Sequence, residues 1–140
     1  AAIDEVGGNL TVHHGPPTRD EGYRAAGELL RATPQLTAIL GTADQMAIGA
    51  MAALRDSGRS VPGDISVAGF NDIAVSKDLS PSLTTVRLPL QEMGRLALDV
   101  ALSPKTAEQV ARGSVEHRLG VELMVRQSTG PARAGLEGAA

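Results

Sequence analysis

The chain has 140 residues and a formal net charge of −3, with 42% hydrophobic and 21% charged residues. This balance is typical of one soluble globular domain and excludes a disordered chain. Tyr23 and Phe70 are the only aromatic residues, and no two Lys or Arg residues are adjacent, so the chain lacks the stacking groups and the basic patch of a nucleic-acid surface. Without any Cys, disulfides and cysteine catalysis are excluded.

The first predicted elements alternate between strand and helix. Residues 9–13 alternate apolar and polar side chains as a short strand does. A helix is predicted over about 19–32, because Thr18 and Glu21 have the spacing of a capping box. Residues 37–40 form a continuous apolar run, which is typical of a strand that is buried on both faces of a parallel sheet.

The next segment repeats this order. Thr42 and Gln45 again have capping-box spacing, and the helix that follows them is predicted to end near Ser57. Residues 65–70 form the strongest predicted strand of the sequence. Strand, helix and strand joined by short loops predict a right-handed parallel crossover. The fold class is therefore α/β, with a parallel sheet and flanking helices.

The second half of the chain is less regular. Its expected elements are a polar loop (71–83), a β-prone stretch (84–88), a helix (90–102), a loop with some helix potential (103–114), and two strand-like stretches (115–119 and 121–126) that form a ribbon or one bent strand. Residues 128–140 are rich in Gly, Ala and Pro and have no periodicity, so we expect a disordered tail there.

Side chains for catalysis or metal binding are not grouped into a known motif. Nucleophile-elbow, phosphate-loop, dinucleotide-binding and zinc-protease patterns are all missing from the sequence. His13 and His14 are neighbours, but on a strand their rings point to opposite faces, which is poor geometry for one metal ion. We therefore expect no catalytic residue, no metal and no cofactor.

Polar side chains do follow the two predicted parallel strands. Asp44 comes shortly after the first strand, and Asn71 and Asp72 follow the second. In open parallel sheets, ligands bind beyond the carboxyl ends of the strands. Asn71 is therefore a candidate ligand contact, with capping of its loop as the alternative. Asp44 is a second candidate, although an acid in the first turn of a helix also complements the helix dipole.

Several stretches together resemble the effector-binding domain of the LacI/GalR family of transcriptional repressors. The similarity runs from about residue 9 to 131, in family order and with family-like spacing. The residues that carry it are 37–58, 61–73, 79–87, the helix that contains Gly94, and 123–131.

This resemblance implies a periplasmic-binding-protein-like fold of type I, with two lobes and a small molecule bound between them. Residues 1–127 would be the C-terminal portion of that domain. Within it, residues 9–83 and 115–127 would belong to the C-terminal lobe, and 84–102 would cross to the N-terminal lobe. The resemblance also implies a cytoplasmic homodimer that binds operator DNA only through an N-terminal helix-turn-helix, which is absent from this chain.

The resemblance places the family's usual ligand contacts at five positions. Pro17 stands where the family often has an aromatic residue that stacks on the effector. Ala43 and Asp44 stand where it often has Asn-Asp, and Asn71 and Asp72 where it usually has Asp-Asp. Asn71 can still donate and accept hydrogen bonds with a hydroxyl group, but it carries no charge. A sugar-like effector is therefore expected.

Three further positions, Ile48, Ala52 and Leu79, fall where family members make dimer contacts. Ordinary core packing is the alternative for these side chains. For the function itself, the leading hypothesis is effector sensing and dimerisation within a DNA-binding regulator. The alternatives are a periplasmic-type sugar-binding protein for transport, a small α/β enzyme, and a regulator whose ligand pocket has degenerated.

Overall fold

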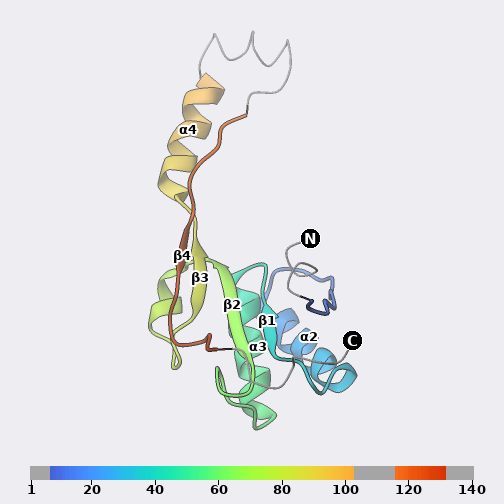
Figure 1. The fold of residues 1–140 in the computed structure, drawn as a ribbon. Helices are drawn as coiled ribbons and strands as arrows, with labels where there is room; N and C mark the ends of the chain where they lie inside the picture. Colours follow the sequence, from blue (N-terminus) through green and yellow to red (C-terminus); the bar gives the residue numbers. More distant parts are fainter. Residues whose placement is uncertain (1–6, 103–115, 132–140) are drawn as a thin grey trace.

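The computed structural model describes residues 7–102 and 116–131 of the chain (Figure 1). Its elements in chain order are α2 (Arg19–Ala32), β1 (Ala38–Leu40), α3 (Asp44–Asp56), β2 (Ser66–Asn71), the short 3-10 helix η1 (Ala74–Lys77), β3 (Thr84–Arg87), α4 (Leu90–Leu102) and β4 (Glu122–Met124). In these two stretches, no helix has both the length and the apolar character needed to span a membrane.

The four strands form one sheet in the order β1-β2-β3-β4. The first three strands are parallel, with Leu40 beside Ala68 and Ala68 beside Thr84, whereas β4 runs antiparallel to β3. This arrangement confirms the predicted α/β class. Because β1, β2 and β3 are parallel, their carboxyl ends lie along the same edge of the sheet, and the loops that follow them can contribute to one site.

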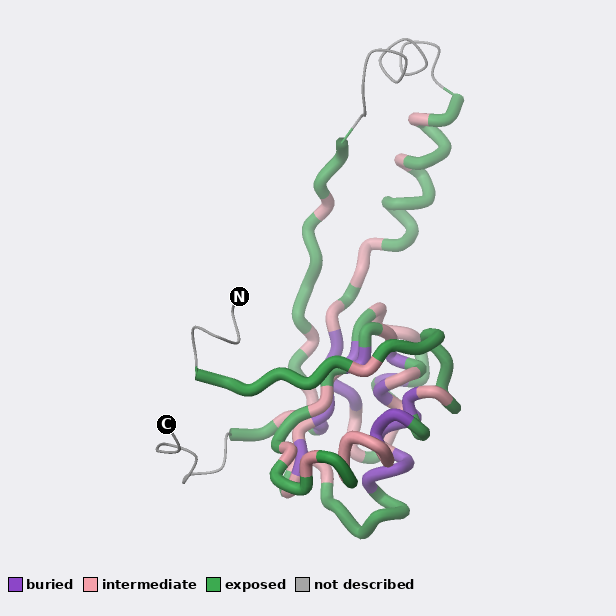
Figure 2. Tube along the Cα trace, turned by 90° about the vertical axis from the view of Figure 1, so that its right-hand side faces the viewer, coloured by how far each residue is buried: buried purple, intermediate pink, exposed green. Residues whose placement is uncertain are grey.

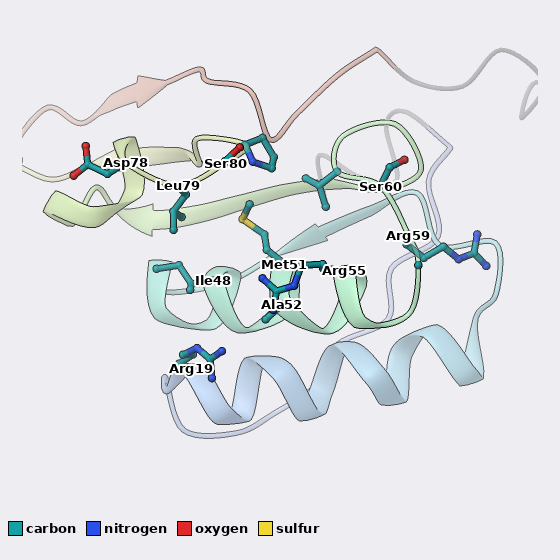
Figure 3. Close-up of a pocket in the computed structure, with 13 residues that line it drawn as sticks. Arg19, Ile48, Met51, Ala52, Arg55, Arg59, Ser60, Asp78, Leu79 and Ser80 are labelled. Atoms are coloured by element: carbon teal, nitrogen blue, oxygen red, sulfur yellow. The ribbon is translucent and has the colours of Figure 1, made fainter.

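Helix α3 lies between the sheet and α2, so the helices form two layers on one face of the sheet (Figure 3). Two glycines allow the helices to approach closely. A Cβ atom at Gly22 would lie 2.1 Å from the carbonyl oxygen of Met46, and one at Gly49 would lie 2.0 Å from the carbonyl oxygen of Arg19. Any side chain at either position would therefore push the two backbones apart.

A hydrogen bond also joins α2 to the end of α3. The Tyr23 hydroxyl donates to Oδ2 of Asp56 at 3.1 Å. This hydrogen bond, together with the negative charge of the carboxylate, raises the pKa of the Tyr23 phenol. The side chain that donates this bond is the only tyrosine in the sequence.

The core lies between α3 and the sheet. Leu54, Ile65, Val67 and Leu83 are each at most 1% exposed and form one cluster with Ala47. The prediction that residues 37–40 are buried on both faces is wrong, because Leu40 is 71% exposed. In the part of the chain that is described, β1 is an edge strand, and α2 and α3 cover one face of the sheet.

Helix α4 stands away from the rest of the domain, with the chain that leads into β4 running beside it (Figure 1). None of its residues is buried, and Leu90, Leu98 and Leu102 are more than half exposed (Figure 2). Its bounds agree with the helix predicted over 90–102.

Three predicted strand stretches are absent or shorter in the structure. Residues 9–13 form no strand, and His13 at their end contacts α2 through its Nε2, which lies 2.8 Å from Glu21 Oε1 and 3.1 Å from Arg24 Nη2. Residues 116–119 also form no strand, and 121–126 is reduced to Glu122–Met124. An alternating pattern predicts a strand only where a neighbouring strand offers hydrogen bonds. Residue 115 and the loop predicted over 103–114 lie outside the described residues.

The two predicted capping boxes have different outcomes. Thr18 caps α2, because its hydroxyl accepts the Glu21 N–H at 3.3 Å. The second is wrong: α3 begins after Ala43, which has no side-chain cap, and the Thr42 hydroxyl donates to the Met46 sulfur instead.

The chain after β4 returns to the sheet. Ser128 is fully buried, and its hydroxyl donates to the Val67 carbonyl at 2.6 Å and accepts the Thr84 N–H at 2.8 Å. The expectation of a disordered tail from residue 128 is therefore wrong for 128–131, where hydrogen bonds of Ser128 to Val67, Ser82 and Thr84 outweigh the flexible composition. Residues 132–140 of the predicted tail lie outside the described part.

Candidate functional site

A hollow of about 430 Å³ opens at the carboxyl ends of β2 and β3, where the chain passes from β3 into α4. We call it the strand-end hollow. It is lined by Asn71, Asp72 and residues 87–92. The structure therefore brings together Asn71 and Asp72, two of the five predicted ligand contacts, and adds Arg87, which the sequence analysis did not single out.

The backbone of Asn71 and Asp72 is strained. Their φ angles are 115° and 55°, and non-glycine residues rarely adopt positive values. Such a conformation costs about 1–3 kcal/mol per residue and persists only where surrounding contacts enforce it. Contacts around the loop after β2 must therefore hold these two residues in their conformation.

Hydrogen bonds to the Asp72 carboxylate help to hold this conformation. It accepts hydrogen bonds from Arg126 Nη2 at 2.6 Å and from Arg87 Nε at 2.7 Å, while its side chain is only 8% exposed. Burial alone would raise the pKa of the Asp72 carboxyl, but the hydrogen bonds from Arg126 and Arg87 outweigh it and hold this pKa below its ordinary value.

The depressed pKa of Asp72 predicts the direction of a pH effect. A carboxyl whose pKa is lower in the folded chain stabilises the fold above its unfolded pKa, and this contribution is lost as the pH falls through the folded pKa. We therefore expect the free energy of unfolding of the wild-type chain to decrease as the pH falls below about 4. Urea unfolding at a series of pH values measures this, and the decrease should be smaller in the Asp72→Asn variant. Equal pH dependence in the two proteins would contradict the assignment.

Asp44 is buried rather than available to a ligand. It is 1% exposed, and its two carboxylate oxygens accept hydrogen bonds from the Ile73 N–H (2.8 Å), the Ser76 hydroxyl (2.7 Å) and the Thr85 hydroxyl (2.5 Å). These donors come from the loop after β2, from η1 and from β3. Asp44 therefore joins the start of α3 to the loop that carries the strand-end hollow, and its predicted contact with a ligand has no support in this geometry.

The two other predicted contacts do not line the hollow. Pro17 is exposed in the turn before α2. Ala43 is half-buried at the start of α3, with φ and ψ of −146° and 150°. Neither side chain offers a polar atom, so they remain predictions that rest on the resemblance alone.

A second concave surface lies along α3. This helix groove has a volume of about 650 Å³ and contains all three predicted dimer positions, Ile48, Ala52 and Leu79 (Figure 3). Arg19, Arg55 and Arg59 also line it, opposite Asp78. Ile48 and Leu79 are partly buried and also pack against the core. Core packing and a dimer contact are therefore compatible for these two residues.

Arg126 is the second functional side chain that the sequence analysis missed. Besides its pairing with Asp72, its Nη1 donates to the Leu83 carbonyl at 2.8 Å, and only 15% of its side chain is exposed. One signal in the sequence could have indicated it: Arg126 directly follows the apolar residues 123–125, and an arginine that is buried with such residues needs an acidic partner.

Comparison with known proteins decides the family. Residues 8–129 match the periplasmic binding protein-like domain family. A lactose operon repressor of Rhizobium radiobacter is 42% identical over 81 residues, which cover 58% of this chain and 72% of that protein. The chain belongs to the LacI/GalR family. It represents the periplasmic-binding-protein-like, effector-binding part of these regulators, as the resemblance implied.

Two further matches of this LacI/GalR domain show how much of a regulator it represents. The transcriptional regulator GalR of Escherichia coli (strain K12) is 44% identical over 92 residues, which cover 66% of this chain and 27% of GalR. A solved LacI-family regulator from Arthrobacter sp. FB24, in complex with lactose, has a TM-score of 0.73 and 31% identity, covering 92% of this chain and 48% of that one. The LacI/GalR domain thus spans about a quarter of the length of GalR.

Proposed function

We propose that this domain binds a neutral, hydroxyl-rich small molecule of the sugar class in the strand-end hollow and acts as the sensor of a transcriptional regulator. The observation that carries the proposal is the side chain of Asn71. This side chain lines the hollow and has no hydrogen-bond partner among the described residues, and the residue that carries it has a positive φ angle.

The chemistry of the lining supports a sugar. An amide group both donates and accepts hydrogen bonds, so Asn71 can engage a hydroxyl group in either direction. Arg87 and Gln91 add donors, and Leu88 and Leu90 provide apolar surface for the C–H groups of a sugar ring. Lactose bound to the related Arthrobacter regulator supports the same class.

Thermal unfolding of the chain with lactose, galactose or ribose tests this proposal. A ligand that binds only the folded state stabilises it by about 2.7 kcal/mol at a hundred times its dissociation constant. We expect at least one of the sugars to raise the unfolding temperature in a saturable way. Asn71→Ala should weaken its binding about tenfold, which is the effect of losing roughly one hydrogen bond.

The matched control is Asn9→Ala. Asn9 is the only other asparagine of the chain, it is exposed, and it does not line the strand-end hollow. Its replacement should leave the sugar-dependent shift unchanged. No shift with any sugar would contradict sugar binding by this chain, and equal binding by the Asn71→Ala variant would place the site elsewhere.

We further propose that the helix groove is a homodimer interface. Its apolar floor of Ile48, Met51 and Leu79 is bordered by three arginines and Asp78, an arrangement that is typical of an interface with an apolar centre and a polar rim. Two copies related by a twofold axis would bury the same surface on each chain.

Sedimentation of the chain over a range of concentrations tests the dimer. Ile48→Glu should shift the equilibrium to monomer, because it places a charge in the apolar centre of the interface. Leu98→Glu is the matched control, since Leu98 is 63% exposed on α4 and outside the groove. If Leu98→Glu alone reduced association, the chains would instead associate through α4.

The remaining expectations concern the whole regulator. Residues 84–102 are proposed to cross to a second lobe, and operator DNA would be bound by a helix-turn-helix outside this chain. A cytoplasmic location and the absence of catalysis fit a regulator of this kind. These proposals are supported by relatives that are transcriptional regulators.

A further inference from the structure

The strained pair Asn71-Asp72 lines the strand-end hollow and lies at the end of β2, beside β3, which leads into α4. Asn71 and Arg87 are register partners on β2 and β3, and Arg87 is in turn opposite Glu122 on β4. The end of β2 is thus adjacent to the chain that leaves the domain toward α4 and to the chain that returns from it.

Asp72 contacts both of these segments through side chains of unequal freedom. Arg126, which follows β4, is 15% exposed and is also fixed to the Leu83 carbonyl, so this arm is anchored. Arg87 of β3 is 47% exposed and shares its guanidinium between Asp72 and Glu122, at 2.7 and 3.3 Å. The Arg87 side chain can therefore exchange Asp72 for Glu122. The Arg126 side chain cannot leave Asp72 as easily, because it is largely buried and also hydrogen-bonded to the Leu83 carbonyl.

The backbone of Asp72 is held as well. Its N–H donates to the Thr85 hydroxyl at 3.3 Å, and the same hydroxyl donates to Asp44. One continuous set of hydrogen bonds thus connects the first turn of α3, the middle of β3 and the residue directly after Asn71. No ligand is needed to complete this set.

We propose that Asp72 is a positioning residue for the effector site: it holds Asn71 in its left-handed conformation, facing the hollow, and ties that conformation to the two segments that flank α4. The proposal rests on the proposed function, because it assigns Asn71 to the ligand. A ligand that moves Asn71 would then act on Asp72 and on its contacts with Arg87 and Arg126, which lie on the two segments that flank α4.

The positioning part is tested without any ligand. Backbone coupling constants from NMR of the full chain report the sign of φ at Asn71, and we compare wild type with Asp72→Asn and Arg126→Lys. We expect Asn71 to return to a negative φ in Asp72→Asn and to keep a mixture of both conformations in Arg126→Lys, which retains the charge but loses the second hydrogen bond. Asp20→Asn, at a 95% exposed side chain, is the control. A positive φ at Asn71 in folded Asp72→Asn overturns the proposal.

The coupling to the site is tested with lactose as the probe, by calorimetry on a double-mutant cycle. Asp72→Asn should weaken lactose binding roughly fivefold in wild type and have little further effect in the Asn71→Ala background, because it acts through Asn71. Additive losses would mean that Asp72 affects binding only by general destabilisation, and would overturn this part. If wild type binds no lactose, the proposed function fails for that sugar, while the NMR comparison still decides whether Asp72 positions Asn71.

Discussion

Replacement of Asp44 by Ala should lower the free energy of unfolding by about 3–5 kcal/mol, because three donors would lose their acceptor and each unsatisfied buried donor costs about 1–3 kcal/mol. The donors are the Ile73 N–H and the hydroxyls of Ser76 and Thr85, and Asp44 itself is 1% exposed. Urea unfolding followed by circular dichroism measures the change.

Two controls accompany this prediction. Asp20→Ala removes a carboxylate whose side chain is 95% exposed, and its effect should stay within about 0.5 kcal/mol. Asp44→Asn keeps the shape and one acceptor, so its loss should lie between the two. A loss below about 1 kcal/mol for Asp44→Ala would show that water replaces the carboxylate and that the loop after β2 does not depend on it.

Replacement of Gly49 by Ala should destabilise the chain by about 2–3 kcal/mol, although alanine is the better helix former by about 1 kcal/mol. The reason is the contact between α2 and α3, where a Cβ atom at Gly49 would lie 2.0 Å from the Arg19 carbonyl oxygen and 2.7 Å from the Tyr23 nitrogen. Both neighbours are backbone atoms, so the helices must separate. Thermal unfolding measures the effect.

Gly94→Ala is the matched substitution in a helix without such a neighbour. A Cβ atom at Gly94 in α4 would meet nothing within 4 Å. We therefore expect Gly94→Ala to increase the helix content or stability by about 0.5–1 kcal/mol. If Gly49→Ala stabilised the chain to the same extent, the close approach of α2 and α3 would not be needed for folding.

The helices could be predicted from the sequence more accurately than the ends of the sheet. The bounds of α2 and α4 agree with the predictions, because an apolar stripe at helical spacing depends on residues within the helix. The absence of a strand over 9–13 and the exposure of Leu40 could not be predicted, because each depends on what lies beside the segment. Ser128 shows the same limit, since its burial depends on contacts with β2 and β3.

The candidate site could be predicted only in part, for a similar reason. The rule that ligands bind beyond parallel strands identified Asn71 and Asp72, which do line the strand-end hollow. The same rule selected Asp44, and the structure shows it buried beneath the loop instead. Arg87 and Arg126 are 15 and 54 residues from Asp72 in the chain, so only the fold brings the two cations to one carboxylate.

The bond between Tyr23 and Asp56 has a practical consequence. With one tyrosine and no tryptophan in the sequence, the near-ultraviolet absorbance of the protein comes almost entirely from a single chromophore. That chromophore lies on α2 and is hydrogen-bonded to the end of α3. An optical signal from the unlabelled chain therefore reports on one junction between two helices, and separation of these helices can be followed without adding a probe.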